Sequence, residues 1–302
     1  MLINRRYTHL LIFMILISVG GCFYLGNLSN EQKIDLSLSW RDATLDCQTT
    51  FHAGKNNKTW FIEQFQFFIS DIEIGSTNAG WQKVKLAKTS FQNQNTALIG
   101  TNCQTEKLHA KDLTNVANDA NWSIKYTTPT DIILDENSRI RFTLGVPFEV
   151  NHLNPISQQS PLNLPSMFWI WQTGHKFLRL ELAANHEKWL FHLGSTGCKS
   201  VSAMRAPEKN CLYPNRFNFE LPLGSNAKKD KGNFALNVDL AELLKHVELS
   251  SSSSCQSEQN NKSCQQLFDN LLLNNKIKSA ETEPGVFNAV NINHKSKGST
   301  VE

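Results

Sequence analysis

The stretch WFIEQFQFFISDIEI, from Trp60 to Ile74, indicates the fold class of this chain of 302 residues. Aromatic and β-branched residues dominate it, and such side chains favour the pleated, half-buried surface of a β-sheet. We therefore predict one or two strands in this stretch.

Strand-like patterns continue on both sides of Trp60–Ile74. Upstream, KIDLSLSW (33–40) alternates apolar and polar residues, which is the period of a strand with one buried face. NHLNPISQQSPLNLPS (151–166) carries three prolines and no periodicity, so we expect a long ordered loop, which in compact domains is often functional. Further strands are predicted at WQKVKLAK (81–88), SIKYTT (123–128), RIRFTLGV (139–146), FWIW (168–171), HKFLRLEL (175–182), KWLFHLG (188–194) and RFNFELPL (216–223).

Helical patterns are scarce and lie toward the C-terminus. DLAELLKHVEL (239–249) and SCQQLFDNLLL (263–273) are candidate helices, and the serine run 250–254 is expected to be a flexible link between them. Many short strands and few helices predict a mainly β protein: an antiparallel β-sandwich with long ordered loops and a short helical, disulfide-tied C-terminal extension. We assign this domain to residues 33–290 and a frayed tail to 291–302.

The N-terminal segment has the pattern of an export signal. Two arginines precede the apolar run LLIFMILISV (10–19), which is too short to span a bilayer comfortably, and two glycines then precede Cys22. We predict a signal peptide at 1–21, lipid attachment at Cys22 and a tether at 22–32; an ordinary signal peptide is the alternative. Because Phe23 replaces the Asp that retains lipoproteins at the inner membrane, the predicted location is the periplasm, at the outer membrane.

The remaining cysteines are even in number, which in an exported chain predicts disulfides. Sequence proximity favours Cys198–Cys211 and Cys255–Cys264, which leaves Cys47–Cys103. None of these pairs has the C-x-x-C spacing of a thiolate metal site. We therefore exclude sulfur from the predicted metal ligands.

Charge and motifs exclude several functions. The formal charge is +3 and the basic residues are scattered, which argues against nucleic-acid binding. The sequence has no nucleophile elbow, phosphate loop or H-E-x-x-H motif. Ser195, three residues after His192, is not a catalytic arrangement by itself. We therefore predict a protein that is not an enzyme.

Histidines at junctions of predicted strands and loops are the candidate metal ligands. They are His152, His175 and His192, with His52 a weaker candidate in the loop after Cys47. Imidazole is a common ligand of copper and zinc, although a single histidine is usually a hydrogen-bonded or exposed ring with no metal. In KWLFHLG, alternation places His192 on the face opposite Trp189 and Phe191.

Trp169 and Trp171, two residues apart on a predicted strand, would face the same side. They could anchor the core, or stack on a sugar ring in a binding module. Native tryptophan is a poor metal ligand because its indole nitrogen is only a donor.

Three long motifs resemble the MbnP-like family: LGVPFEVNHLNP (144–155), SPLNLPSMFWIWQTGHKFLRLEL (160–182) and FHLGSTGC (191–198). SCQQLF (263–268) and PGVFNA (284–289) extend the resemblance over most of the domain. The family is similar to the four-cysteine partner of metallo-mystery pairs. The resemblance implies an exported copper-binding protein that is a substrate of a periplasmic di-haem enzyme related to cytochrome c peroxidases.

In that family the di-haem partner oxidises a tryptophan to kynurenine, which leaves an aryl amine and a ketone that can reach a metal. The resemblance thus implies copper held by His152, His192 and an oxidised Trp169 or Trp171. His175 stands where the family usually has Tyr; it could add a ligand, but we favour a structural role. Phe148, Phe168 and, least of all, Phe191 are expected to wall the site. The competing hypothesis is a metal-free carbohydrate- or protein-binding surface β-sandwich lipoprotein, and a copper oxidase comes third.

Overall fold

The computed structural model describes residues 31–103, 120–128, 134–170, 172–223, 232–273 and 285–290. The strands and helices below all belong to the unit that begins at Gln32. The predicted signal peptide, Cys22, Trp171 and the predicted tail lie outside the described residues, so those predictions stay predictions.

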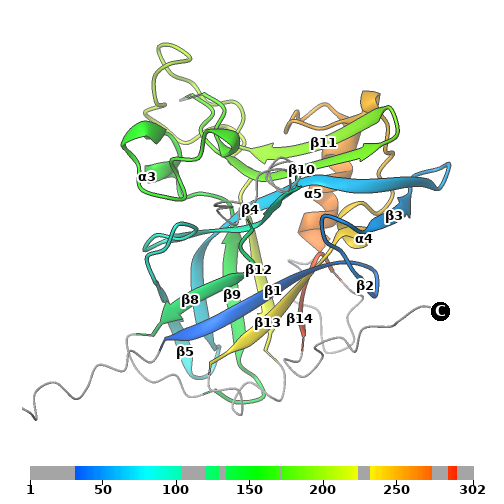
Figure 1. Ribbon diagram of the computed structural model, residues 1–302. Helices are drawn as coiled ribbons and strands as arrows, with labels where there is room; N and C mark the ends of the chain where they lie inside the picture. Colours follow the sequence, from blue (N-terminus) through cyan, green and yellow to red (C-terminus); the bar gives the residue numbers. More distant parts are fainter. Residues whose placement is uncertain are drawn as a thin grey trace, which may run out of the picture. The chain divides into compact units, whose positions relative to one another are not determined.

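The larger sheet is assembled around one long strand, β4 (Lys58–Ser76), which contains the whole stretch Trp60–Ile74 (Figure 1). Its middle is buried, as its aromatic and β-branched composition predicts. The sheet has the order β11-β10-β4-β9-β12, and β3, β5 and β7 also pair with β4. The bounds are β3 (Thr50–Ala53), β5 (Gly80–Lys83), β7 (Thr96–Asn102), β9 (Arg139–Leu144), β10 (Lys176–Ala184), β11 (Glu187–Gly194) and β12 (Phe217–Pro222).

The smaller sheet has the order β14-β13-β1-β8-β6, with β2 beside β1. One of its pairs, β1 with β13, is parallel, so this sheet of the predicted sandwich is mixed. Parallel partners need a long connection, and here every strand of the larger sheet lies between them in sequence. The bounds are β1 (Gln32–Trp40), β2 (Ala43–Thr44), β6 (Lys85–Leu86), β8 (Ser123–Thr127), β13 (Phe234–Asp239) and β14 (Phe287–Val290).

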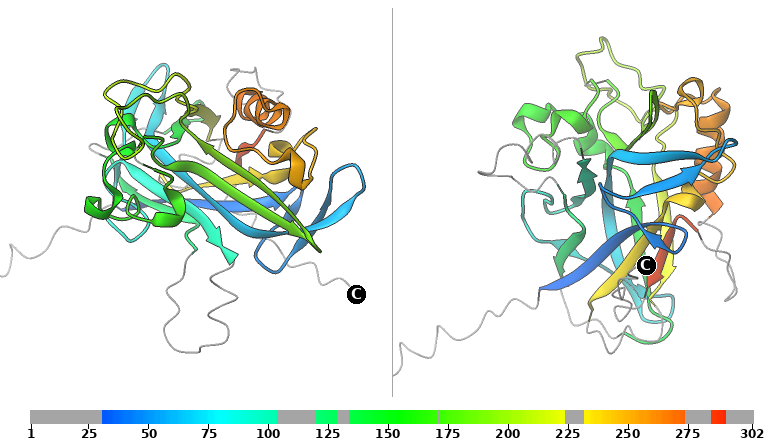
Figure 2. Two further views of the ribbon diagram at one scale, coloured as in Figure 1. Left: turned by 90° about the horizontal axis from the view of Figure 1, so that it is seen from above. Right: turned by 45° about the vertical axis from the view of Figure 1, so that its right-hand side comes forward.

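Aromatic side chains of both sheets meet in the core. Phe287 on β14 of the smaller sheet lies 5.7 Å from Phe67 on β4, 5.2 Å from Phe142 on β9 and 4.7 Å from Phe219 on β12, measured between ring centroids. Such edge-on pairs add to the free energy gained from burying apolar area. The mainly β, sandwich-like class predicted from the sequence is confirmed, and Figure 2 shows the two sheets from further directions.

The long loop between β9 and β10 carries the short helix α3 (Phe148–Asn151) and 3-10 turns at Pro155–Ser157 and Pro165–Met167. The strand predicted at FWIW is wrong over its described residues 168–170, where Phe168 makes only an isolated bridge to His175; Trp171 lies outside the described residues. A tight turn follows, in which the Gly174 N–H donates to the Ile170 carbonyl at 2.7 Å. Gly174 has φ +78°, and a Cβ there would lie 2.6 Å from Asn151, so only glycine fits.

The C-terminal extension is partly as expected. Helix α5 (Lys262–Leu273) covers the predicted second helix, whereas α4 (Leu240–Leu243) is much shorter than predicted although Asp239 caps it. The serine run is not a flexible link: it forms a 3-10 turn at Ser251–Ser253 with a capping box. No helix among the described residues is long and apolar enough to cross a membrane.

Candidate metal centre

His192 lies on β11, the edge strand of the larger sheet, directly opposite Arg179 of β10. Its Nε2 is 2.9 Å from Oε1 of Glu181, which also accepts from Nε of Arg179 at 2.7 Å. Burial raises the pKa of Glu181, but these hydrogen bonds and the charge of Arg179 outweigh burial and lower the pKa to about 2. An ionised carboxylate only accepts, so Nε2 of His192 carries the hydrogen.

Nδ1, the other ring nitrogen of His192, is consequently able to bind a metal ion. Burial lowers the pKa of this ring, partly offset by Glu181, so the ring is neutral near pH 7 and Nδ1 holds a lone pair. The side chain is only 7% exposed, and within the described part of the protein Nδ1 has no hydrogen-bond partner. A buried polar atom without a hydrogen-bond partner lowers the stability of the folded protein by about 1–3 kcal/mol. A ligand bound to Nδ1 would remove this cost.

Trp169 lies beside the imidazole ring of His192. The ring centroids of Trp169 and His192 are 6.5 Å apart at an angle of 53°. The indole packs against Gly194, two residues after His192 and on the same face, where a Cβ would lie 2.5 Å from Cζ3 of Trp169. Glycine at position 194 therefore makes room for the indole.

Lys176 fixes the segment that leads to Trp169. Its Nζ donates to the carbonyls of Ser166 at 3.0 Å and Phe168 at 3.3 Å, and it lies 5.9 Å from the Trp169 ring centroid. Burial, with a contribution from Arg179, lowers the pKa of Lys176 to about 8. The ammonium group thus ties the loop to the sheet beside the indole.

His175 is placed differently. It is fully buried, with Nδ1 2.9 Å from the carbonyl of Asn151 and Nε2 2.9 Å from the carbonyl of Leu162. The rings of Phe68 and Phe168 meet it edge-on at 5.7 and 4.9 Å. Each nitrogen faces a loop carbonyl, and the neutral ring donates its one N–H to one of them, which supports the structural role that we favoured over a ligand role.

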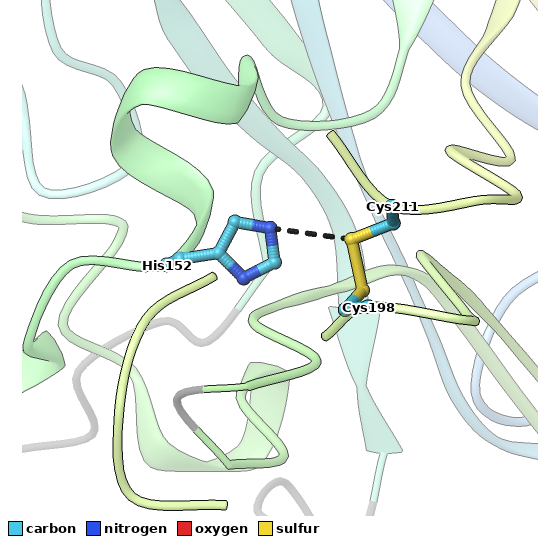
Figure 3. Close-up of side chains that lie close together, drawn as sticks. All are labelled: His152, Cys198 and Cys211. Carbon is cyan, nitrogen blue, oxygen red and sulfur yellow. Dashed lines mark hydrogen bonds between the residues drawn. A yellow bond between two sulfur atoms is a disulfide. The ribbon is translucent and has the colours of Figure 1, made fainter. Parts of the chain in front are cut away.

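His152 ends α3 and is 4% exposed (Figure 3). Oδ1 of Asn151 accepts from the His175 backbone N–H at 2.8 Å, which turns Nδ2 toward His152. Nδ2 is 3.1 Å from Nε2 of His152, so Nε2 is the acceptor. Nε2 also lies 3.7 Å from Sγ of Cys211. His152 is thus beside a disulfide, whereas His192 is beside Trp169 and Glu181.

The other predicted residues are also placed. The three disulfides are Cys47–Cys103, Cys198–Cys211 and Cys255–Cys264, the pairs that sequence proximity favours. His52 is exposed on β3, with Nδ1 3.3 Å from the Asn57 carbonyl of its own hairpin. Phe148 lies 5.0 Å from the His152 ring, while Phe191 is in the core.

Sequence reasoning missed three residues of this region. Arg179 and Glu181 alternate with leucines in HKFLRLEL, which could have indicated a shared polar face opposite the core. Their pairing with His192 depends on the hairpin register, which the pattern does not give. No pattern in the sequence indicates that Asn151 contacts both His152 and His175.

Comparisons with known proteins agree with this architecture. Among solved structures, MbnP from Methylosinus trichosporium is similar, with a TM-score of 0.62 over 79% of this chain and 87% of that chain. The sequences are 18% identical, so this likeness shows the fold alone. Among curated proteins nothing matches. The MbnP family model matches residues 29–264, more than half of the sequence. The chain therefore belongs to the MbnP family.

Proposed function

We propose that this chain is an exported copper-binding protein whose site is centred on Nδ1 of His192 and an oxidised Trp169. The MbnP family is associated with copper and methanobactin systems, and its members are generally binding proteins and not catalysts. The observation that carries the proposal is the buried lone pair of His192 beside an indole. Neutral imidazole suits copper in either oxidation state.

Glu181 orients the proposed ligand. Its hydrogen bond holds Nε2–H at 2.9 Å and so keeps the lone pair on Nδ1. Carboxylates that hold a ligating histidine in this way fix its tautomer and raise its basicity. Arg179 in turn holds the carboxylate.

The tryptophan must be modified before it can bind. Indole nitrogen donates only, whereas kynurenine offers an aryl amine and a ketone. A di-haem partner of the cytochrome c peroxidase class is the proposed oxidant. Trp169 is favoured by its position against His192, and Trp171, outside the described residues, stays the alternative.

His152 stays a proposed second ligand, although Asn151 would have to release its Nε2. His175 is the weakest member of the set because both of its nitrogens face carbonyls. Export agrees with three disulfides. The lipid anchor at Cys22 and the outer-membrane location complete the proposal.

The test co-expresses the chain with its di-haem partner and measures copper affinity by competition with a chelator. His192→Ala should weaken binding at least about tenfold, whereas His186→Ala, the same change at an exposed position, should not. Mass spectrometry should find the oxidised residue in the wild type and in Trp171→Phe but not in Trp169→Phe. Equal affinity of both histidine variants would reject the site, and an unmodified wild-type chain would reject the maturation.

The alternative is a metal-free protein-binding surface. It is favoured by apolar side chains exposed on the loops that precede β10 and β12, among them Ile156 at 91%, Val201 at 87% and Leu212 at 69%. A contiguous patch of such side chains would mark an interaction surface. A copper-free chain that binds its partner as tightly as the loaded chain, with no affinity for copper, would favour this alternative.

A further inference from the structure

We propose that the Cys198–Cys211 disulfide and His152 form a second, redox-gated metal site, which opens when the disulfide is reduced and then takes a thiophilic ion such as Cu(I) or Zn²⁺. The ligand atoms of the three residues all lie within 4.8 Å of one another. Figure 3 shows the imidazole of His152 pointing toward the disulfide, with Nε2 nearest to Sγ of Cys211.

The spacing suits one shared ion. Bonds of about 2.0–2.3 Å in a tetrahedral site place neighbouring ligand atoms roughly 3.5 Å apart. Nε2 of His152 and Sγ of Cys211 are already 3.7 Å apart. The two sulfur atoms must separate, which breaking their bond permits.

The amide of Asn151 holds the lone pair of His152 Nε2. The backbone N–H of His175 fixes this amide, whose Nδ2 donates to Nε2 at 3.1 Å, while Sγ of Cys211 lies 3.7 Å from the same nitrogen. Nε2 is therefore an acceptor in the oxidised protein. Once the bond to Cys198 is broken, Asn151 must release Nε2 before its lone pair binds the ion.

The step balances with a dithiol as reductant. The dithiol gives two electrons and two protons, the Cys198–Cys211 bond breaks, and two thiols form while the dithiol becomes a disulfide. Binding of the ion then releases the two thiol protons to solvent. The product is a site with two thiolates and one imidazole.

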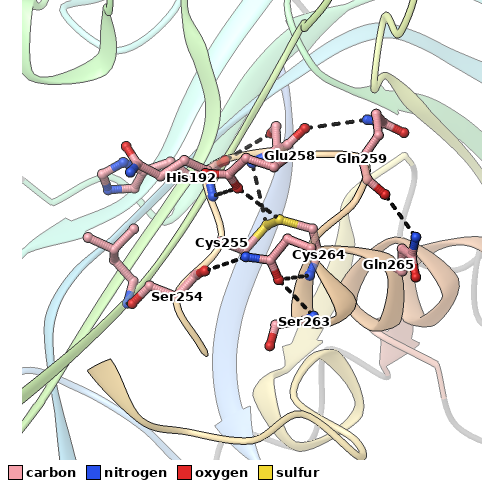
Figure 4. The surroundings of a disulfide bond; sticks show 12 residues. His192, Ser254, Cys255, Glu258, Gln259, Ser263, Cys264 and Gln265 are labelled. Atoms are coloured by element: carbon pink, nitrogen blue, oxygen red, sulfur yellow. Dashed lines mark hydrogen bonds between the residues drawn. A yellow bond between two sulfur atoms is a disulfide. The ribbon is translucent and has the colours of Figure 1, made fainter. Parts of the chain in front are cut away.

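Access distinguishes this disulfide from Cys255–Cys264. Cys198 is partly exposed and begins a loop in which Lys199, Val201 and Arg205 are exposed. Cys255 and Cys264 are fully buried, although Glu258 gives them a similar cluster (Figure 4). In the remaining pair Cys47 is partly exposed, as Cys198 is, but the ligand groups found among the described residues include neither Cys47 nor Cys103. A dithiol should therefore reach Cys198–Cys211 before Cys255–Cys264.

The experiment uses the full chain expressed without a di-haem partner, so that both tryptophans are native. Limited treatment with a dithiol is followed by alkylation mapping, and Co²⁺ and then Zn²⁺ are titrated. We expect reduction at Cys198–Cys211 before Cys255–Cys264, one ion per chain reduced at Cys198–Cys211, and a thiolate-to-cobalt charge-transfer band that the oxidised chain lacks. His152→Ala should lose at least about tenfold in affinity, whereas His192→Ala and the exposed control His186→Ala should not.

Three results would overturn the proposal: equal binding by oxidised and reduced chains, reduction of this pair only on unfolding, or full affinity in His152→Ala. Cys198→Ser/Cys211→Ser should lose the charge-transfer band, and the cobalt spectrum of the reduced wild type tests the site even if that variant fails to fold. The inference also stands apart from the proposed copper function. That function is tested on oxidised, matured protein through His192, so either can fail alone, and loss of copper in His152→Ala only after reduction assigns His152 to this second site.

Discussion

His175 and His192 are both buried next to the same hairpin, and they differ in what their second nitrogen meets. Both nitrogens of His175 lie 2.9 Å from carbonyl oxygens of the loop, while Nδ1 of His192 has no partner within the described residues. Burial is common to both rings and therefore does not identify a ligand. The unpaired lone pair, held in place by Glu181, is the reason that we propose His192 and not His175 as the ligand.

The first prediction concerns the structural histidine and has the largest expected effect. His175→Ala should lower the free energy of unfolding by about 3 kcal/mol, because it leaves a cavity and strips two buried carbonyls of their contacts. Urea unfolding measures this, with His186→Ala as the control. A loss below about 0.5 kcal/mol would contradict the structural role.

The second prediction concerns the residue that holds His192. Glu181→Ala should weaken copper binding about 10- to 100-fold, since Nε2 loses the acceptor that fixes its tautomer. Glu181→Gln, whose amide oxygen can still accept from Nε2–H, should recover much of that loss. If Ala and Gln behave alike, Glu181 does not act by accepting this hydrogen bond.

The third prediction concerns the space beside the ring. Gly194→Ala places a Cβ where Cζ3 of Trp169 now lies 2.5 Å away, so the indole must move. Overpacking of this kind costs about 1–3 kcal/mol, and the emission of Trp169 should shift. Comparison with Gly194→Ala in a Trp169→Phe background isolates that emission. An unchanged spectrum would show that the indole does not pack there.

The fourth prediction is the smallest and concerns acid. The pKa of Glu181 is about 2 in the folded protein and 4.5 ordinarily, so its contribution to stability is present above 4.5 and is lost as pH falls toward 2. Glu181→Gln should remove that part of the pH dependence in metal-free protein. Parallel unfolding midpoints for wild type and variant between pH 2 and 5 would contradict it.

The comparison also shows what sequence could predict. Local patterns sufficed for the strand at Trp60–Ile74, for the face of His192 and for two disulfides, since each depends on periodicity or short separation, and Cys47–Cys103 then followed as the remaining pair. They failed at FWIW, where Gly174 packs on Asn151, a residue more than twenty positions earlier, and the chain turns instead of extending. The contact of Glu181 with His192 depends on hairpin register, and the contact of His152 with Cys211 depends on the fold.

The central claim is that Nδ1 of His192 and the oxidised ring of Trp169 share a copper ion. Anomalous diffraction at the copper edge, from crystals of the chain matured by its partner, tests it most directly. The account predicts a peak about 2 Å from Nδ1 of His192 and within bonding reach of the modified residue 169. A peak elsewhere, with Nδ1 still unpaired beside an intact indole, would contradict it.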